Sequence, residues 1–245
     1  MSTDVLHPER WRTVKEALLN LLFPPRCINC RREGEWLCAE CRSRIEYVPL
    51  PICPKCGRRL ANNRGWSPSE SCFDCRDVRI DAIRSVAYSE GVLRDAIHHF
   101  KYNGVQALAA PFGQLLYDYW QTQNIPADLL IPVPLHPRRL RERGYNQSLL
   151  LAEQLARRVG LPVDQAALRR VKHTRPQVGL GARERQENVA DAFECVSSSL
   201  AGQRVVLIDD VCTTGNTLEA CSQALKAQGV RSVWALTLAR AKELT

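Results

Sequence analysis

Residues 204–220 read RVVLIDDVCTTGNTLEA, and this stretch decides the fold class of the 245-residue chain. Its first part holds four consecutive aliphatic residues, Val205 to Ile208, a pattern typical of a strand that is buried on both faces of a sheet. Two adjacent acids, Asp209 and Asp210, end this run, and a short turn rich in hydroxyl groups then leads into a helix. A buried strand followed at once by a helix predicts an α/β domain with a parallel sheet.

Strands and helices alternate along most of the remaining chain. Strands are predicted at 83–89, 128–135 and 230–240, and helices at 91–102, 107–121, 147–159 and 217–228. We expect residues 136–148, HPRRLRERGYNQS, to form a basic loop that leads into the third of these helices. Ligands of such sheets bind at the carboxyl ends of the strands, where both the acid pair and the basic loop fall. Residues 78–245 are therefore predicted to form one α/β domain with a ligand site at that edge.

The turn after the acid pair has the composition of an anion site. Unpaired N–H groups at a helix N-terminus, together with the helix dipole, attract a phosphate. Hydroxyl groups of Thr213, Thr214 and Thr217 add donors, and Gly215 lets the backbone approach a ligand closely. The acids would repel a phosphate but would accept hydrogen bonds from neutral hydroxyls or hold a cation. A ligand with a phosphate beside a diol, such as a ribose 5-phosphate, satisfies both halves of the stretch.

Other interpretations of this stretch fit less well. It lacks the GxxxxGKS or GxxxxGKT pattern of a P-loop, and no lysine lies in the turn. A paired-aspartate magnesium site of the receiver-domain type would lack the phosphate-binding turn. A purely structural strand end, whose threonines cap the helix, is the remaining alternative.

Eight of the eleven cysteines form four CxxC pairs in the first third of the sequence. A CxxC turn points two thiolates at one place, and two such turns complete a tetrahedral shell of sulfur ligands around Zn²⁺. Four pairs therefore suit two structural zinc sites, with the pairs combined either sequentially or in an interleaved order. Residues 26–77 are predicted to form a double zinc ribbon whose ligands are Cys27, Cys30, Cys38, Cys41, Cys53, Cys56, Cys72 and Cys75.

Two other uses of these cysteines are weaker interpretations. A disulfide framework would need an oxidising compartment, and a redox site needs one CxxC pair rather than four. Residues 51–70 are too poor in apolar side chains to fold alone, and a structural zinc supplies the missing stability, on the order of 10 kcal/mol. Cys195, Cys212 and Cys221 stand apart from the pairs and are expected to be small buried residues.

The chain has a formal net charge of +8, which favours an anionic partner such as phosphate, polyphosphate or nucleic acid. The excess is concentrated between Arg138 and Arg185, where twelve Arg or Lys residues stand against four Asp or Glu residues. A basic surface retained for solubility is the alternative explanation.

No stretch approaches the roughly 18 to 20 apolar residues that a membrane-spanning helix needs. Residues 1–25 have charges inside an apolar pattern and lack a signal-peptide cleavage site, so we expect a cytoplasmic protein without stable membrane insertion. Trp11, Val14, Leu18 and Leu22 fall on one face of a predicted N-terminal helix that stops at a Pro-Pro pair. This face is expected to pack on the protein itself, with a peripheral membrane helix as the alternative.

Residues 205–217, VVLIDDVCTTGNT, resemble the phosphoribosyl diphosphate (PRPP) signature of type I phosphoribosyltransferases, which consists of a hydrophobic strand, two acids and a TTGxT turn. Residues 131–148 and 174–193 extend the match, and nearly everything from Cys27 onward resembles the ComF/GntX family of competence-associated proteins. The resemblance implies a double zinc ribbon joined to a domain similar to that of amidophosphoribosyltransferases.

The resemblance also implies roles for individual residues. Asp209 and Asp210 would contact the ribose hydroxyls, and the turn around His136 and Arg138 would approach the pyrophosphate. The residues that would wrap the 5-phosphate are Thr213, Thr214, Gly215, Asn216 and Thr217. A mobile loop would close over the substrate and bring to the leaving group Arg175, Gln177, Arg183 and Arg185. The three arginines of that loop are the catalytic candidates, and Mg²⁺ would accompany PRPP.

The family's link to natural transformation implies a role in uptake or processing of single-stranded DNA, together with proteins of the DNA-uptake machinery. The zinc ribbons and the basic segment 138–185 would contact the strand, with Tyr145 or Trp66 stacking on bases. Two alternatives stay open: a phosphoribosyltransferase with an unknown acceptor, and a sensor that binds PRPP or a nucleotide without turnover. Glutamine-dependent amidotransfer is not expected, because the sequence begins Met1-Ser2-Thr3 and zinc ribbons stand where a glutaminase domain would be.

Overall fold

The computed structural model describes residues 24–60, 72, 75, 78–171, 192–197 and 199–242. No helix within these ranges is long and apolar enough to cross a membrane. Several predicted features lie outside them and stay predictions: the N-terminal helix with its apolar face, Trp66, and the loop that carries Arg175, Gln177, Arg183 and Arg185.

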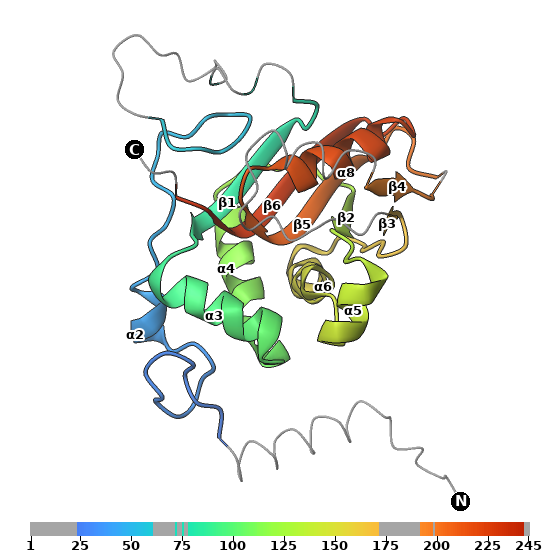
Figure 1. The fold of residues 1–245 in the computed structure, drawn as a ribbon. Helices are drawn as coiled ribbons and strands as arrows, with labels where there is room; N and C mark the ends of the chain where they lie inside the picture. The colour runs from blue at the N-terminus through green and yellow to red at the C-terminus, as the bar shows by residue number, and fades with distance from the viewer. Residues whose placement is uncertain are drawn as a thin grey trace, which may run out of the picture.

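Four strands form one parallel sheet in the order β1-β6-β5-β2 (Figure 1). The strands are β1 Ala82–Tyr88, β2 Leu129–Pro132, β5 Arg204–Cys212 and β6 Ser232–Arg240. β5 therefore lies inside the sheet, with β6 on one side and β2 on the other. The parallel α/β sheet predicted from residues 204–220 is confirmed.

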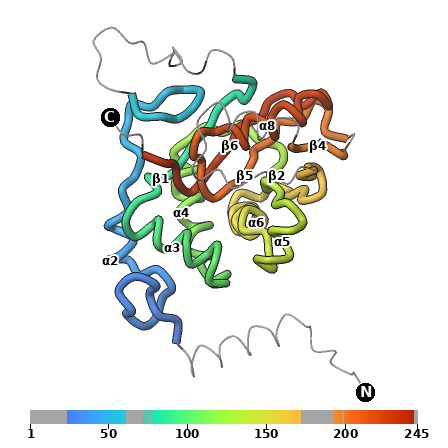
Figure 2. Tube along the Cα trace, in the orientation of Figure 1, coloured from blue at the N-terminus to red at the C-terminus, as the bar shows by residue number. Residues whose placement is uncertain are grey.

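Helices cover both faces of the sheet (Figures 1 and 2). One face carries α3 Gly91–Tyr102, α4 Ala109–Gln121 and α6 Gln147–Val159, and the other carries α8 Asn216–Lys226. A short 3₁₀ turn, Gln106–Leu108, precedes α4. All four predicted helices are present, with their ends within two residues of the predicted positions.

The side chains of β5 alternate between two hydrophobic cores. Val206 and Ile208 pack into the core beneath α3, α4 and α6, while Val205 and Leu207 pack into the core beneath α8. Because both faces of the strand are covered, every position must be apolar, and this explains the uninterrupted aliphatic run.

A small antiparallel sheet pairs β3 Leu168–Arg170 with β4 Phe193–Cys195. Leu168 and Phe193 join the core beneath α8. Each of these strands has three residues, which is too short for an alternating pattern to be recognised, and neither was predicted.

Two local features correct the expectations from sequence. β5 continues through Cys212 rather than ending at the acid pair, because Val211 and Cys212 still pair with β6. The basic stretch expected to be a loop contains a helix, α5 Pro137–Arg143. Proline at its first position and Gly144, with φ 82°, at its end are ordinary start and stop signals of a helix.

The cysteine-rich segment follows the β1 side of the α/β domain and is anchored to it at both ends (blue to cyan in Figure 2). Its first half contains the short helix α2 Ala39–Arg42, and Leu37 and Ile45 pack into the core beneath α3 and α4. In its second half, the carbonyl of Lys55 accepts a hydrogen bond from Ile83 N–H of β1 at 2.7 Å. The segment is therefore part of the folded body rather than a separate appendage.

Candidate functional site

Asp209 and Asp210 lie near the carboxyl end of β5, where two helices from other parts of the chain reach them. Lys101, near the end of α3, places its Nζ 2.7 Å from Asp210 Oδ1. Ser148, in the first turn of α6, donates its hydroxyl to Asp209 Oδ1 at 2.8 Å. The acid pair is therefore held between α3 and α6.

Asp210 is buried, with 2% of its surface exposed. Lys101 pairs with its Oδ1, but its Oδ2 is buried and has no hydrogen-bond partner among the described residues. Burial alone would lower the pKa of Lys101, but the facing charge of Asp210 outweighs this effect and raises the pKa. Buried polar atoms without a partner are rare in folded proteins, so Asp210 Oδ2 is an acceptor suited to a hydroxyl or a cation of a ligand.

The carboxyl group of Asp209 ionises less readily than that of an ordinary aspartate. Burial and the neighbouring charge of Asp210 raise its pKa to about 7, against the opposing effects of Lys101 and Ser148. Carboxyl groups with such shifts cluster at functional sites, where a bound ligand supplies the donors that the protein lacks.

Asp209→Asn should stabilise the unliganded protein more at pH 8 than at pH 5.5. The carboxyl pKa is 3.8 in an ordinary environment and about 7 in the folded chain, so the folded state holds a proton that the unfolded state releases. The stability of the wild type therefore falls as the pH rises through this window, whereas asparagine does not titrate. We expect the advantage of the variant in the free energy of unfolding to grow by about 1–2 kcal/mol between the two pH values.

Urea denaturation of the zinc-loaded protein measures this difference. An advantage that is the same at both pH values would show that Asp209 titrates in its ordinary range.

The turn between β5 and α8 has the geometry of an anion site. Gly215, with φ 84°, is the N-cap residue of α8 and offers no side chain to the amides of the first turn. The amides of the first helical turn have no intrahelical partner, so they are donors for a ligand. Thr214 Oγ1 lies 3.5 Å from Asn216 N, which places one threonine hydroxyl within the same turn.

Glycine is required at position 215 for two reasons. Its left-handed backbone is strained for other residues, and an added Cβ would lie 3.3 Å from Ile83 Cδ1 of β1. The turn is therefore packed against the first strand of the sheet, and its shape depends on the position of that strand.

His136 and Arg138 follow β2, the strand beside β5, and so lie at the same edge of the sheet as the acid pair. Val133 N–H donates to the carbonyl of Ile208 at 3.0 Å, so the chain leaves β2 alongside the end of β5. Arg138 N–H donates to His136 Nδ1 at 3.2 Å, and the Arg138 side chain pairs with Glu142 at 2.9 Å. The contact of these residues with a pyrophosphate stays a prediction.

Lys101 and Ser148 were not assigned a role from the sequence, although both touch the acid pair. Ser148 is the last residue of segment 131–148, which resembles the family, so the sequence did offer evidence that this residue belongs to the site. Lys101 had no such signal, because only the tertiary fold brings the end of α3 to the end of β5.

Tyr145 does not stack on bases, contrary to the sequence-based expectation. It is 9% exposed, its hydroxyl donates to the carbonyl of Phe100, and its ring packs against the Phe100 ring with centroids 6.0 Å apart. The ring is a core side chain under the basic helix α5 rather than part of its surface.

The eight paired cysteines form two four-sulfur clusters, and the pairs combine sequentially. One cluster is Cys27, Cys30, Cys38 and Cys41, and the other is Cys53, Cys56, Cys72 and Cys75. In each cluster the sulfur atoms lie within 4.8 Å of one another, and distances of 3.6 Å join Cys30 to Cys38 and Cys56 to Cys72. Sulfur ligands about 2.3 Å from Zn²⁺ in a tetrahedron lie about 3.8 Å apart, so both clusters fit a structural zinc ion.

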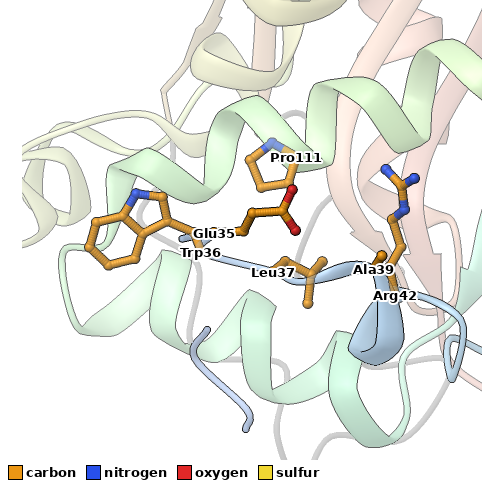
Figure 3. Close-up of a pocket in the computed structure, with 6 residues that line it drawn as sticks. All are labelled: Glu35, Trp36, Leu37, Ala39, Arg42 and Pro111. Carbon is orange, nitrogen blue, oxygen red and sulfur yellow. The ribbon is translucent and has the colours of Figure 1, made fainter. Parts of the chain in front are cut away.

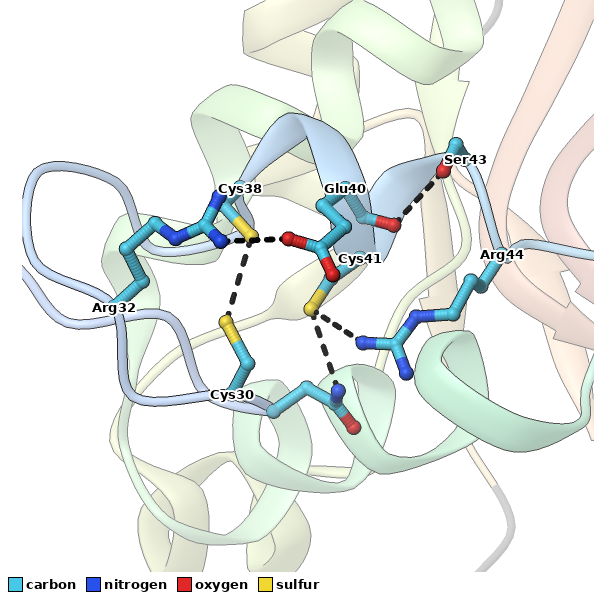
Figure 4. A network of polar contacts seen from close by, with 8 residues as sticks. Cys30, Arg32, Cys38, Glu40, Cys41, Ser43 and Arg44 are labelled. Atoms are coloured by element: carbon cyan, nitrogen blue, oxygen red, sulfur yellow. Dashed lines mark hydrogen bonds and ion pairs between the residues drawn. The ribbon is translucent and has the colours of Figure 1, made fainter.

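Donors around Cys27, Cys41 and Cys53 favour the thiolate form, which is the form that binds zinc. Burial and the neighbouring thiols instead raise the pKa of Cys38, Cys56 and Cys75. Burial would raise the pKa of Cys27 and Cys53, but backbone N–H groups aimed at their sulfur atoms lower the pKa values to about 6 and about 7. In the first cluster, Arg44 and Asn29 donate to Cys41 Sγ at 3.0 and 3.3 Å (Figure 4). A zinc ion with four thiolates carries a net charge of −2, which the Arg44 guanidinium partly offsets.

The three remaining cysteines show no such arrangement. Cys212 and Cys221 are buried in the core as predicted, and Cys195 is only partly buried. Burial raises the pKa of Cys212 to about 11, which keeps this thiol protonated and unreactive at neutral pH.

A cavity of about 300 Å³ lies between the cysteine-rich segment and α4 (Figure 3). Its lining residues are Glu35, Trp36, Leu37, Ala39, Arg42 and Pro111. None of them belongs to the strand ends or turns that carry the acid pair and the anion-binding turn, so this cavity is not the predicted ligand site.

Two family models match separate parts of the chain, and related proteins match most of its length. The double zinc ribbon domain model matches residues 18–76, and the phosphoribosyl transferase domain model matches residues 146–245. Competence protein F of Haemophilus influenzae is 33% identical over 232 residues, which cover 89% of this chain and 98% of that protein. The DNA utilization protein YhgH of Escherichia coli K12 is 31% identical over 229 residues, which cover 90% and 99% of the two chains.

Among solved structures, the chain is similar to a glutamine PRPP amidotransferase from B. subtilis, with a TM-score of 0.38 and 21% identity over 54% of this chain and 26% of that one. The identity to competence protein F extends over nearly the full length of that relative, and the two matched domains follow one another in this chain. The chain therefore belongs to the ComF family of competence proteins and joins a double zinc ribbon to a phosphoribosyltransferase-type domain.

Proposed function

We propose that the protein binds PRPP or a related ribose phosphate at the acid pair and the following turn, and that it acts in the cytoplasm in uptake or processing of single-stranded DNA. The observation that carries the binding site is a buried Asp210, with one oxygen that has no partner among the described residues, beside a half-buried Asp209 and a helix whose N-cap residue is Gly215. Relatives named competence protein F and DNA utilization protein support the proposed role in uptake or processing of DNA. The partners in this role would be proteins of the DNA-uptake machinery.

The two halves of the site suit the two halves of a ribose phosphate. Asp209 and Asp210 would accept hydrogen bonds from the ribose hydroxyls. Asp210 Oδ2, which has no partner among the described residues, can accept one of these bonds. The amides and hydroxyls of residues 213–217 would hold the 5-phosphate. Mg²⁺ would offset the pyrophosphate charge of PRPP, and the carboxylate oxygens of the acid pair are the hard donors in this region that suit it.

Phosphoribosyl transfer is a second candidate function, favoured by the match to the phosphoribosyl transferase domain. Breaking the bond between C1 and pyrophosphate builds positive charge on the ribose and negative charge on the leaving group. The residues that would stabilise the leaving group are Arg175, Arg183 and Arg185, and a closing loop would exclude water. The acceptor of such a transfer is the part of the reaction that no residue identifies.

One titration separates these functions. Zinc-loaded protein is titrated with Mg·PRPP, with and without single-stranded DNA, and pyrophosphate release is followed. If Mg·PRPP binds and pyrophosphate is released only when DNA is present, DNA handling and phosphoribosyl transfer are parts of one activity. Pyrophosphate release without DNA would indicate another acceptor or hydrolysis of PRPP. Binding without release in either case would favour the sensor, and absence of binding would overturn the ribose-phosphate site.

Replacing Arg138, Arg139 and Arg141 by glutamine should weaken binding of single-stranded DNA and lower its salt dependence. These arginines belong to α5, a helix of seven residues with one acid. Each phosphate contact on a single strand contributes about 0.7 to the slope of log affinity against log salt, so loss of three contacts should reduce the slope by up to about 2. Fluorescence anisotropy at several salt concentrations measures both effects.

The control removes the same charge from the opposite edge of the sheet. Arg79 and Arg231 precede β1 and β6, and Arg157 lies in the last turn of α6, so their replacement by glutamine should leave the salt slope unchanged. Equal effects of the two triple variants would show that net charge, rather than the α5 surface, governs binding.

A further inference from the structure

The last residue of α3, Tyr102, is an exposed aromatic side chain that follows Lys101, the ion-pair partner of Asp210. It is 67% exposed, although tyrosine usually buries most of its ring. Its neighbour in sequence, Lys101, is fixed by the ion pair with Asp210. The ring is linked to the acid pair on a second side as well, because it lies against Arg143, whose partner Gln147 directly precedes Ser148, a donor to Asp209.

The side chains of Arg143 and His98 pack against the Tyr102 ring, and much of the ring stays exposed to solvent. The guanidinium carbon of Arg143 lies 5.3 Å from the ring centroid, and the His98 ring lies 5.0 Å from it. Arg143 is held in turn by a hydrogen bond to Gln147 in the first turn of α6. The ring is therefore positioned by side chains from α3 and α5, whose ends lie side by side.

The positive charge around the Tyr102 ring favours an anionic partner that also carries flat aromatic groups. α5 contributes Arg138, Arg139, Arg141 and Arg143 against one acid, Glu142. An aromatic ring within a row of arginines is the arrangement that proteins use for single strands, since the arginines follow the phosphates and the ring stacks on a base. Tyr145 cannot supply that ring because it is buried against Phe100, whereas Tyr102 is on the surface.

We propose that Tyr102, supported by Arg143, is a stacking site for a nucleobase of a single-stranded nucleic acid whose backbone follows α5. This inference rests on the proposed function in DNA handling and deepens it, because it assigns base contact to one residue beside the ribose-phosphate site. Stacking on a single ring accepts every base, so the site is expected to be independent of sequence.

Anisotropy with two labelled strands of equal length tests the stacking site: an oligothymidylate, and an abasic strand with the same phosphates and no bases. We expect Tyr102→Ala to weaken binding of the oligothymidylate about tenfold and to leave binding of the abasic strand unchanged. Tyr102→Phe keeps the ring and should bind both strands as the wild type does. Because the side chain is exposed, the variants are expected to retain their zinc content and melting temperature, which are measured in parallel.

The outcomes distinguish this inference from the function on which it rests. If the wild type binds neither strand at low salt, DNA binding itself fails and the stacking site with it. If the wild type binds the oligothymidylate and Tyr102→Ala binds it equally well, only the stacking site is overturned. A loss that is the same for both strands would also overturn it, because the effect would then act through the phosphates.

Discussion

Replacing Asp209 and Asp210 together by alanine should abolish binding of Mg·PRPP. The two carboxylates are the acceptors at the end of β5, and Asp210 Oδ2 has no partner among the described residues. A hydrogen bond to a charged group contributes about 1.5–3 kcal/mol, and a ribose diol would lose two of them. Affinity should therefore fall by more than about 100-fold, below what calorimetry detects at ordinary protein concentrations.

The alanine variant also leaves Lys101 without its ion-pair partner, so a loss of affinity needs a structural control. Asp209→Asn with Asp210→Asn preserves the volume of both side chains and should lose binding equally, with unchanged zinc content and circular dichroism. Asp118→Ala removes an exposed acid from α4 and should bind as the wild type does. Unchanged affinity in either double variant would overturn the assignment of the pocket.

Protein groups compensate the two carboxyl groups of the acid pair only in part. Desolvation and the neighbouring charge of Asp210 raise the pKa of the half-buried Asp209, and Asp210 keeps a buried oxygen without a partner among the described residues. Neither feature stabilises the fold, since a buried charge without full hydrogen bonding costs free energy. Both features favour a ligand site over a purely structural strand end, because a ligand would supply donors to these oxygens.

The local parts of this site could be predicted from the sequence because each depends on a short, contiguous pattern. The aliphatic run before Asp209 indicates a buried strand, the small polar residues that follow the acids indicate a turn into a helix, and the CxxC spacing indicates metal ligands. The structure places these parts as the patterns imply, and it also decides between the sequential and the interleaved combination of the cysteine pairs, which the spacing had left open.

The parts that depend on tertiary contacts could not be predicted. Lys101 reaches Asp210 only because α3 crosses toward the carboxyl end of β5, and no local pattern encodes that crossing. Tyr145 looked accessible because it lies in an arginine-rich stretch, but its ring turns inward onto Phe100. α5 has seven residues and no buried side chain, so it lacks the apolar stripe by which a helix is recognised.

Replacing Cys53 and Cys56 by serine should remove one zinc ion and also weaken binding of Mg·PRPP. The second cluster is docked on the sheet by its backbone: Ile83 N–H donates to Lys55 O at 2.7 Å, and the Arg240 guanidinium donates to Cys56 O at 2.9 Å. A structural zinc site of this kind supplies on the order of 10 kcal/mol. Without it, residues 51–60 have too few apolar side chains to keep this position.

The effect should reach the anion-binding turn through Ile83. Gly57 is buried against this residue, and a Cβ at position 57 would lie 2.4 Å from the Ile83 carbonyl oxygen. The Ile83 side chain in turn lies against Gly215, with only 3.3 Å left for an added Cβ. If the second cluster loses its zinc, β1 loses this support, and the turn between β5 and α8 loses the neighbour that holds it in place. Binding of Mg·PRPP must then also order this turn, and this cost should lower the affinity by at least about tenfold.

The first cluster provides the matched control, because it contains the same number of ligands in a different place. Leu37 and Ile45 anchor it in the core beneath α3 and α4, whereas Ile83 belongs to the core beneath α8. Cys27→Ser with Cys30→Ser should therefore reduce zinc from about two to about one per chain, as the other double variant does, and leave the affinity for Mg·PRPP unchanged. Equal losses of affinity in the two variants would show that zinc acts on overall stability. A loss confined to the second cluster would show that this ribbon shapes the phosphate site.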